Sequence, residues 1–435
     1  MNKEKKLIPE LRFPEFEKNG EWEVKEFSSF IKLYRGSSPR PIQEYLTQSI
    51  TGVNWIKIGD TKNAVNSIIN QVGEKITTKG AEKSRKVEKG ELILANSMSY
   101  GKTYELGIDG CIYDGWFVLR EYEKQYHKPF LLQLLNSEYM QQQYQRLAAG
   151  GIVQNISSEI VYKTMLFHIS RQEQQKIASC LSSLDDVIET HNQKLDALKD
   201  HKNGLMQNLF PQDGEKVPKY RFPEFENDEE WSFEPFGKVY SFLITNSFSR
   251  DKLNYDKGGV RNIHYGDIHT KFSTLFDITK EDVPFINLNV PLDKIKPENY
   301  CQVGDMVFAD ASEDMYDIGK SIEIVNLKDE KLLSGLHTIL ARQIKTKLAV
   351  GFGGYLFKSS LIRRQIQREA QGAKVLGISG TRLSGISIFF PKNKKEQQKI
   401  TICLSAMDDL IKAQTEKIKQ LTTYKKGLMQ GLFPS

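Results

Sequence analysis

The residues best placed to do chemistry are two short triplets, Gly-Lys-Thr at 101–103 and Gly-Lys-Ser at 319–321. A phosphate-binding P-loop also needs a glycine five residues before such a triplet, because main-chain N–H groups must cradle the phosphates. Asn96 and Asp314 stand at those positions. The triplets therefore do not predict a nucleotide site.

Other catalytic patterns are equally incomplete. His264 and His269 have a spacing that suits neither a strand face nor a helical pair of metal ligands. The adjacent aspartates at 185–186 and 408–409 point in different directions on a helix, so we interpret them as exposed or partner-facing rather than as an acid/base pair. The sequence contains no Pro-Pro pair, so the proline-proline-aromatic motif of amino-methylating DNA methyltransferases is missing. We expect no catalytic site, bound cofactor or metal in this chain.

Charge is distributed unevenly along the 435 residues. The whole chain has 61 basic and 55 acidic side chains, a net charge of +6, but residues 342–395 alone hold twelve Lys/Arg against one acid. A milder basic stretch at 57–89 has eight bases and four acids. A one-sided basic surface is what binding to phosphates requires, although a solvated face without a ligand would look the same.

Length and composition narrow the class of protein further. At roughly 100–200 residues per domain, the chain predicts two to four domains. We find no apolar run of about 18 residues and no export signal, so we expect a cytoplasmic protein that does not enter membranes. The four cysteines form no CxxC pair and predict neither disulfides nor a zinc ribbon.

The most informative feature is an internal repeat. The segment RFPEF at 12–16 returns at 221–225, and EQQKI at 173–177 returns at 396–400. From EQQKI to LFP the two copies share 21 of 39 positions. The linker between the copies resembles what the C-terminus followed by the N-terminus would make, which indicates a cyclic, pseudo-twofold arrangement with the termini close together.

The well-repeated segment has the pattern of a coiled coil. Seam residues alternate at spacings of four and three over four heptads, and the second copy repeats them 223 positions later. Polar residues interrupt both seams at the same places, His191/Gln414 and Lys202/Lys425. An antiparallel pair would bring His191 beside Gln414 at its midpoint, unless His191 is only a partly exposed edge. The first seam comprises Ile177, Leu181, Leu184, Ile188, His191, Leu195, Leu198, Lys202, Leu205 and Leu209.

The variable segments before each repeated helix are predicted to be mixed α/β. Short apolar stretches, such as VNWIKIG, ELILAN, CIYDGWFVLR and VYKTMLFHI, predict strands. A single helix is expected from Lys128 to about residue 148, with a counterpart from Gly354 to about residue 370. The second helix places Arg363, Arg364 and Arg368 within two turns.

Two variable domains, each followed by a helix that begins EQQKI and ends GLMQxLFP, resemble the DNA-specificity subunit of type I restriction–modification systems. The resemblance covers essentially the whole chain. It implies an α+β protein in which two mixed α/β target recognition domains are joined by two long antiparallel coiled-coil helices in a pseudo-twofold, cyclic repeat. The expected domains are the first target recognition domain (1–171), the first repeated helix (172–211), the second target recognition domain (212–395) and the second repeated helix (396–435).

The same resemblance implies a non-catalytic subunit that reads a bipartite site in double-stranded DNA, one domain per half-site. The paired helices would set the gap between half-sites and hold two modification subunits. Those subunits would bind S-adenosylmethionine and methylate adenine N6, and motor-nuclease restriction subunits would complete the complex. The alternatives are a self-contained DNA methyltransferase or nuclease with fused reading domains, and a stand-alone DNA-binding scaffold.

The DNA-binding candidates lie in matching places of the two halves, and an ordinary surface role is the alternative for each. They occupy the positions before the two GD turns, the loops after GELILA and GDMVFA, the turns after each domain's helix, and the second helix itself. The candidates are Lys57, Asn96, Ser97, Tyr100, Lys102, Gln154 and Asn155 in the first half, and His264, Ser312, Tyr316, Lys320, Arg363, Arg364, Arg368, Lys374 and Arg382 in the second.

Overall fold

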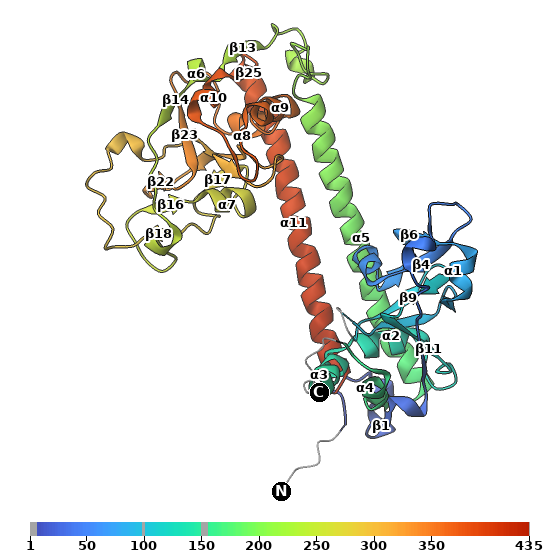
Figure 1. Cartoon of the computed structure of the whole chain (residues 1–435). Coiled ribbons are helices and arrows are strands. Elements are labelled where there is room, and N and C mark those ends of the chain that lie inside the picture. Colours follow the sequence, from blue (N-terminus) through green and yellow to red (C-terminus); the bar gives the residue numbers. More distant parts are fainter. Residues whose placement is uncertain (1–6, 98–100, 149–154, 435) are drawn as a thin grey trace. The chain divides into compact units, whose positions relative to one another are not determined.

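The computed structural model describes residues 7–97, 101–148 and 155–434 (Figure 1). Its contacts divide the chain into two compact units. Unit 1 combines Met1–Lys194 with Gln414–Ser435, and unit 2 is Leu195–Ala413. The described residues combine helices and sheets, which confirms the predicted α+β class. No helix in these ranges is long and apolar enough to cross a membrane.

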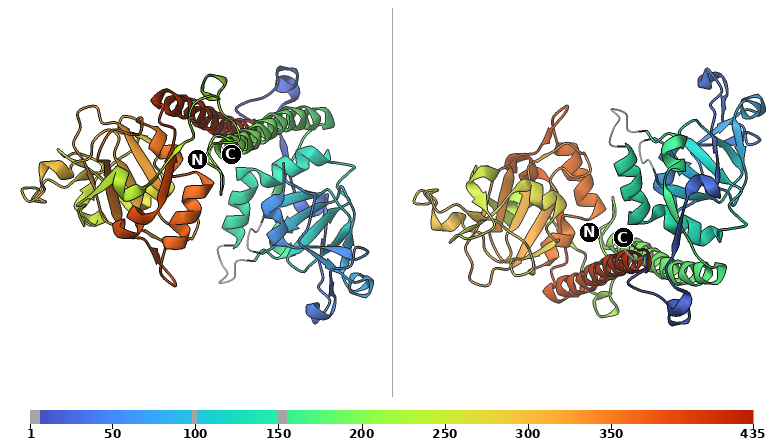
Figure 2. Two further views of the ribbon diagram at one scale, coloured as in Figure 1. Left: turned by 90° about the horizontal axis from the view of Figure 1, so that it is seen from above. Right: turned by 90° about the horizontal axis from the view of Figure 1, so that it is seen from below.

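Two long helices, α5 (Arg171–Asn208) and α11 (Lys394–Leu432), each contribute to both units (Figures 1 and 2). In unit 1, Lys425 of α11 binds Asp185 of α5, and Gln414 binds His191. In unit 2, Lys202 of α5 binds Asp408 of α11. In unit 1 the partner on α11 changes from Lys425 to Gln414 as the residue on α5 changes from Asp185 to His191, so the two helix segments run antiparallel there.

The predicted contact between His191 and Gln414 is confirmed. The Gln414 amide donates to His191 Nδ1 at 2.8 Å and to the His191 carbonyl at 2.7 Å. Gln414 is only 7% exposed, so both of these bonds satisfy a buried amide group. The interpretation of the paired aspartates is wrong for Asp185 and Asp408, which bind lysines of the facing helix within this chain.

The C-terminal end of each long helix packs into a domain core. After α5, Leu209 and Phe210 are buried in the core of unit 2, where Phe210 meets Trp231 and Phe352. After α11, Leu432 and Phe433 enter the core of unit 1 in the same manner. The repeated LFP sequence therefore anchors each helix through large apolar side chains, whose burial stabilises the joint.

The described residues of unit 1 form two five-stranded sheets and a two-stranded sheet. The run at 92–95 is buried at every position, as expected for a central strand covered on both faces. One sheet has the order β3 (Leu46–Thr47), β6 (Glu74–Ile76), β4 (Val53–Ile56), β10 (Gly110–Ile112), β7 (Arg85–Val87). The other has the order β2 (Lys32–Arg35), β11 (Trp116–Arg120), β8 (Leu92–Ala95), β9 (Thr103–Leu106), β5 (Ile68–Ile69), and β1 (Glu23–Glu26) pairs with β12 (Met165–His168).

Unit 2 repeats this scheme with one five-stranded sheet, one four-stranded sheet and two pairs of strands. Its five-stranded sheet has the order β14 (Tyr240–Leu243), β23 (Thr338–Gln343), β19 (Met306–Ala309), β21 (Ser321–Asn326), β17 (Leu275–Asp277). The four-stranded sheet has the order β15 (Leu253–Asn254), β18 (Phe285–Ile286), β16 (Arg261–Ile263), β22 (Leu332–Ser334). The pairs are β13 (Ser232–Pro235) with β25 (Ser387–Phe390), and β20 (Ala311–Ser312) with β24 (Leu376–Gly377).

The predicted single helices are each broken into two. Unit 1 has α2 (Lys128–Asn136) and α3 (Glu138–Ala148), and unit 2 has α8 (Phe352–Leu356) and α9 (Ser360–Glu369). The intervening residues, Ser137 and Ser359, are extended, and each hydroxyl donates to the carbonyl three residues earlier. A serine that satisfies a helix end in this way ends one helix and begins the next. The other helices are α1 (Thr78–Glu82), α4 (Ser158–Tyr162), α6 (Phe236–Val239), α7 (Tyr265–Thr270) and α10 (Gly380–Gly385).

Candidate nucleic-acid interface

In unit 1, the fold joins two of the segments that the sequence analysis selected. The loop after β8 meets the segment before α4, where Ser97 forms an isolated antiparallel bridge with Asn155. The Ile156 amide donates to the Asn96 carbonyl at 2.8 Å. Two candidate sites that are far apart in sequence therefore form one edge of the unit. Two further candidates, Tyr100 and Gln154, lie outside the described residues.

The side chains at this edge differ in their freedom to bind a ligand. Asn96 is 4% exposed, and its amide donates to the Asp114 carbonyl at 2.9 Å. This residue therefore fixes the turn at 113–115. Lys102 is exposed, and its ammonium has no partner among the described residues. Asn155 is exposed as well.

Unit 2 forms the same edge from the corresponding segments. β20 pairs with β24, and the Ile378 amide donates to the Asp310 carbonyl at 2.9 Å. Ser312 is buried, and its hydroxyl accepts the Asp314 amide in a tight turn. Tyr316, at the tip of the loop, is 82% exposed. Lys374, in the segment that leads to β24, is exposed without a partner in the described part of the chain.

The three arginines of α9 have different roles. The Arg363 guanidinium donates to the carbonyls of residues 316, 318 and 319 at 2.6–3.0 Å, and burial lowers its pKa. Its donors are therefore occupied in holding the 310–320 loop against the helix. Arg364 and Arg368 are exposed, and within residues 7–97, 101–148 and 155–434 their guanidinium groups have no partner. These two cations are free to meet phosphates.

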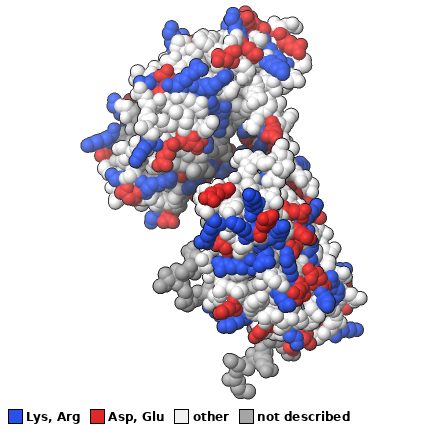
Figure 3. Space-filling view, turned by 45° about the vertical axis from the view of Figure 1, so that its right-hand side comes forward, with Lys and Arg blue, Asp and Glu red and all other residues white. Residues whose placement is uncertain are grey.

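Two further basic candidates of unit 2 are partly engaged. Lys320 donates to the His269 carbonyl at 2.7 Å and lies 3.5 Å from the Asp317 carboxylate. Arg382 donates to the Glu369 carbonyl at 3.2 Å and lies 3.4 Å from its carboxylate. On the face drawn in Figure 3, acidic side chains lie among the basic ones. The uneven charge of the sequence is therefore partly compensated in the fold.

Lys57 and His264 hold equivalent places, as their positions before the GD turns predicted. Lys57 is the N-cap of a short 3-10 helix (Ile58–Asn63), and His264 is the N-cap of α7. Lys57 forms an ion pair with Glu74. His264 is 7% exposed, and its Nδ1 accepts the Gly266 amide at 3.2 Å. Burial lowers the pKa of His264, with the nearby Arg250 guanidinium acting in the same direction, so its imidazole is neutral at neutral pH.

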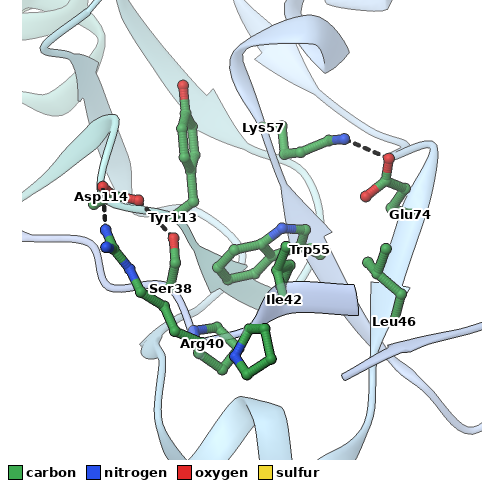
Figure 4. Close-up of a pocket in the computed structure, with 11 residues that line it drawn as sticks. Ser38, Arg40, Ile42, Leu46, Trp55, Lys57, Glu74, Tyr113 and Asp114 are labelled. Carbon is green, nitrogen blue, oxygen red and sulfur yellow. Dashed lines mark hydrogen bonds and ion pairs between the residues drawn. The ribbon is translucent and has the colours of Figure 1, made fainter. Parts of the chain in front are cut away.

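Lys57 also borders a pocket of about 820 Å³ in unit 1 (Figure 4). Trp55, Tyr113 and aliphatic side chains form its walls, and the Lys57–Glu74 pair lies opposite Ser38, Arg40 and Asp114. Ser38 donates to Asp114 at 2.5 Å, and this bond lowers the pKa of that carboxylate. Apolar walls with a rim of both charges can accept a group that has a flat apolar face and polar edges.

Ser38, Arg40 and Asp114 are not among the residues predicted from the sequence. In unit 2, the corresponding omission is Tyr265, whose ring contacts those of His264, His269 and His337. His337 lies 3.2 Å from Asp310, at the base of the 310–320 loop. One sequence feature could have identified Asp114 and His337 as candidates, because each lies in a turn between two apolar strands. Within the described residues, no group of three His, Cys, Asp or Glu could hold a metal ion.

Comparisons with known proteins show what the chain is similar to. A family model described as the type I restriction modification DNA specificity domain matches residues 19–200. Over 425 residues the chain is 24% identical to the MjaX type I restriction enzyme specificity subunit of Methanocaldococcus jannaschii, covering 95% of this chain and 92% of that protein. It is 23% identical to the MjaVIII specificity subunit of the same organism over 438 residues, covering 97% and 93%.

Solved structures show the same fold. The S subunit of a type I restriction–modification system from M. genitalium matches with a TM-score of 0.57 at 14% identity, covering 98% of this chain and 99% of that one. A chain from a study of complex assembly and conformational transition in a type I system matches with a TM-score of 0.58 at 16% identity, covering 95% and 98%. The relatives are specificity subunits, and the matched domain is a DNA specificity domain. Residues 19–200 thus match the type I restriction modification DNA specificity domain, and the chain over nearly its whole length is similar to type I specificity subunits.

Proposed function

We propose that each unit of this chain reads one half of a bipartite site in double-stranded DNA. The observation that carries the proposal is the edge that both units share. Ser97 with Asn155 in unit 1, and Ser312 with Leu376 in unit 2, join a loop after a central strand to the segment that follows the domain helices. Exposed cations without partners among the described residues lie at or near this edge, namely Lys102, Arg364, Arg368 and Lys374.

Such cations position a protein on the phosphates, whereas polar side chains at the groove read base edges. We assign the first role to Arg364, Arg368 and Lys374. Asn155 and Tyr316, which are exposed at the same edges, are the proposed contacts to bases. Asn96 and Arg363 hold these loops in place.

We further propose that α5 and α11 form an antiparallel coiled coil with pseudo-twofold symmetry, and that this rod fixes the gap between half-sites. Equivalent ion pairs support it, since 408 − 185 and 425 − 202 both equal 223. Two modification subunits would dock on the rod, bind S-adenosylmethionine and methylate adenine, and restriction subunits would complete the complex. The proposed domains keep the boundaries 1–171, 172–211, 212–395 and 396–435.

The test begins with mapping of methylated adenines in the source genome, which yields both half-sites and their gap. The chain, co-expressed with its modification subunits, should bind a duplex carrying the mapped site at least a hundredfold more tightly than a scrambled duplex at the same salt concentration. Scrambling one half-site should abolish this preference. Equal affinity for mapped and scrambled duplexes would refute the proposal.

A further inference from the structure

Each unit contains one aspartate that joins three separate elements. In unit 1, Asp185 of α5 accepts the Lys425 ammonium of α11 on Oδ1 at 2.5 Å. Its other oxygen, Oδ2, accepts the Gln133 amide of α2 at 3.1 Å. One carboxylate therefore binds the facing helix with one oxygen and the recognition domain with the other.

Unit 2 repeats the arrangement with a different partner in the domain. Asp408 of α11 accepts the Lys202 ammonium of α5 on Oδ1 and the Tyr355 hydroxyl of α8 on Oδ2, the latter at 2.8 Å. The Lys202 ammonium also lies 5.8 Å from the centre of the Tyr355 ring. The carboxylate and the lysine are repeated in both units, whereas the domain's side chain is not.

These charges are costly in their surroundings. Both lysine side chains are 20% exposed and stand in seams whose other positions, apart from His191 and Gln414, hold apolar residues. An apolar side chain at either lysine position would stabilise the helix pair by burial, but it would not fix the orientation of the helices relative to the domain. An ionic hydrogen bond has a preferred length and angle, so it specifies one relative position of the groups that it joins.

The recognition domains are also attached at the first turn of each long helix. In unit 1, Glu173 binds Arg12 and Trp22, and Gln174 donates to the Gln125 carbonyl. Asp185 follows Glu173 by twelve residues (185 − 173), which is about 18 Å along a helix at about 1.5 Å per residue. With one attachment the domain could rotate about that point. Two attachments this far apart fix the angle between the domain and the long helix.

Unit 2 has the same second attachment at the same distance. Glu396 binds Arg221 and Trp231 in the first turn of α11, and Asp408 follows it by twelve residues (408 − 396). Apolar packing of each helix against its domain core reaches Leu181 in unit 1 and Leu404 in unit 2. Each aspartate lies one turn beyond that packing and is well placed to act on the angle.

We propose that Asp185 and Asp408 are positioning residues that set the angle between each recognition domain and the helix pair, and so determine which gap between half-sites the protein accepts. This inference rests on the proposed function. Because Gln133 serves one unit and Tyr355 the other, the two angles can be altered independently. The substitutions Gln133→Leu and Tyr355→Phe each remove one hydrogen bond and keep the side chain's approximate size.

The test uses the full chain with its modification subunits and duplexes that carry the mapped half-sites at the mapped gap or at a gap one base pair shorter or longer. Wild-type protein should prefer the mapped gap at least tenfold. Gln133→Leu and Tyr355→Phe should each reduce this preference to threefold or less, while discrimination against a scrambled half-site is retained. Asp186→Asn and Asp409→Asn alter the neighbouring exposed carboxylates and should leave the preference unchanged.

A second measurement reports the angle without DNA. Spin labels introduced as unnatural amino acids at Lys124 and Lys417, two exposed positions of unit 1, give a distance distribution between the domain and α11. Gln133→Leu should broaden it, and Asp186→Asn should not. If Gln133→Leu loses thermal stability, Asp185→Asn is used in its place, and if Tyr355→Phe does, Asp408→Asn is used. Both asparagine variants keep the shape of the carboxylate.

The possible results distinguish a failure of this inference from a failure of the proposed function. A gap preference and a distance distribution that both survive in the folded variants would overturn this inference alone. Wild-type protein that binds the mapped site with no gap preference would overturn this inference and the proposed role of the rod together. Wild-type protein that ignores the mapped half-sites would refute the proposed function, and the distance distribution would still decide whether Asp185 sets the angle.

Discussion

At the residue scale, the basic side chains of α9 separate into structural and surface groups. Arg363 uses its donors on three carbonyls, whereas Arg364 and Arg368 are exposed. We predict that the double substitution Arg364→Gln and Arg368→Gln weakens DNA binding. It should also make the slope of log K against log salt concentration less steep by about 2, since each lost phosphate contact reduces the magnitude of that slope by about 0.9. Fluorescence anisotropy titrations between about 50 and 200 mM salt measure this slope.

Two matched variants complete that experiment. Lys257→Gln removes an exposed cation from another part of unit 2 and should leave the slope nearly unchanged. Arg363→Gln should instead lower the melting temperature, because it leaves three carbonyls of the 310–320 loop without a donor. An unchanged salt slope in the double variant would show that this face of α9 points to solvent in the complex.

The burial of Glu323 predicts that the stability of unit 2 depends on pH. Its carboxylate is fully buried and accepts the amides of Gly351 and Gly354 at 2.7 Å, yet burial raises its pKa to about 7. A raised folded pKa means that the folded state holds the proton more tightly. The stabilisation is therefore complete below about pH 4.5 and is lost as pH rises through about 7, a change of about 3 kcal/mol.

The free energy of unfolding of unit 2 should thus fall from pH 5 to pH 8 in the wild type and fall less in Glu323→Gln. Trp231 packs against Phe352 of α8, so a fluorine label on this tryptophan reports the local transition by NMR. Glu105→Gln in unit 1, where the carboxylate pairs with Lys128 at 2.5 Å, serves as the control and should leave the Trp231 transition unchanged. Parallel pH profiles for wild type and Glu323→Gln would contradict the assignment.

At the scale of elements, the heptad spacing was sufficient to predict the long helices and the layer that joins His191 to Gln414, because seam periodicity depends on local sequence. The sequence pattern did not reveal that Lys202 and Lys425 bind aspartates of the facing helix, since opposite charges on two helices become neighbours only once register is known. The breaks at Ser137 and Ser359 were missed for a similar reason. A serine can lie inside a helix, and the sequence alone does not show whether its hydroxyl will instead bind a carbonyl at a helix end.

The candidate interface was predictable as segments but not as individual side chains. Repeat alignment selected loops that the fold brings together, such as Ser97 with Asn155. Whether a polar side chain is free depends on carbonyls contributed by other segments, which is why Asn96 and Arg363 are internal and Arg364 is not. Periodicity contains no information about those partners.

The polar layer between the helices makes a prediction about stability. Replacing both His191 and Gln414 with Ile exchanges a buried amide and a half-buried imidazole for apolar side chains, at the centre of a seam that is otherwise largely apolar. We expect the melting temperature to rise by a few degrees, because a polar seam position specifies register at a cost in stability. His191→Ile alone should lower it, since it leaves the Gln414 amide without its ring acceptor. Differential scanning calorimetry of the wild type, the double variant and His191→Ile measures these melting temperatures. A lower melting temperature in the double variant would contradict the expectation.

At the scale of the whole molecule, the proposed rod makes the gap between half-sites a consequence of helix length. Seven residues add two turns and about 10 Å to a helix, which matches about three base pairs at about 3.4 Å each. Inserting one heptad into α5 between His191 and Leu195, and one into α11 between Gln414 and Ile418, preserves the seam in both helices. We predict that the recognised gap lengthens by about three base pairs while both half-sequences stay the same, as measured by mapping methylated adenines in cells that express the variant with its modification subunits. A heptad in α5 alone is the control, and it should lower the melting temperature because one seam then lacks a partner. If the doubly extended protein modifies DNA at the original gap, the helices do not set the spacing, and the recognition domains must reach their half-sites independently of the rod.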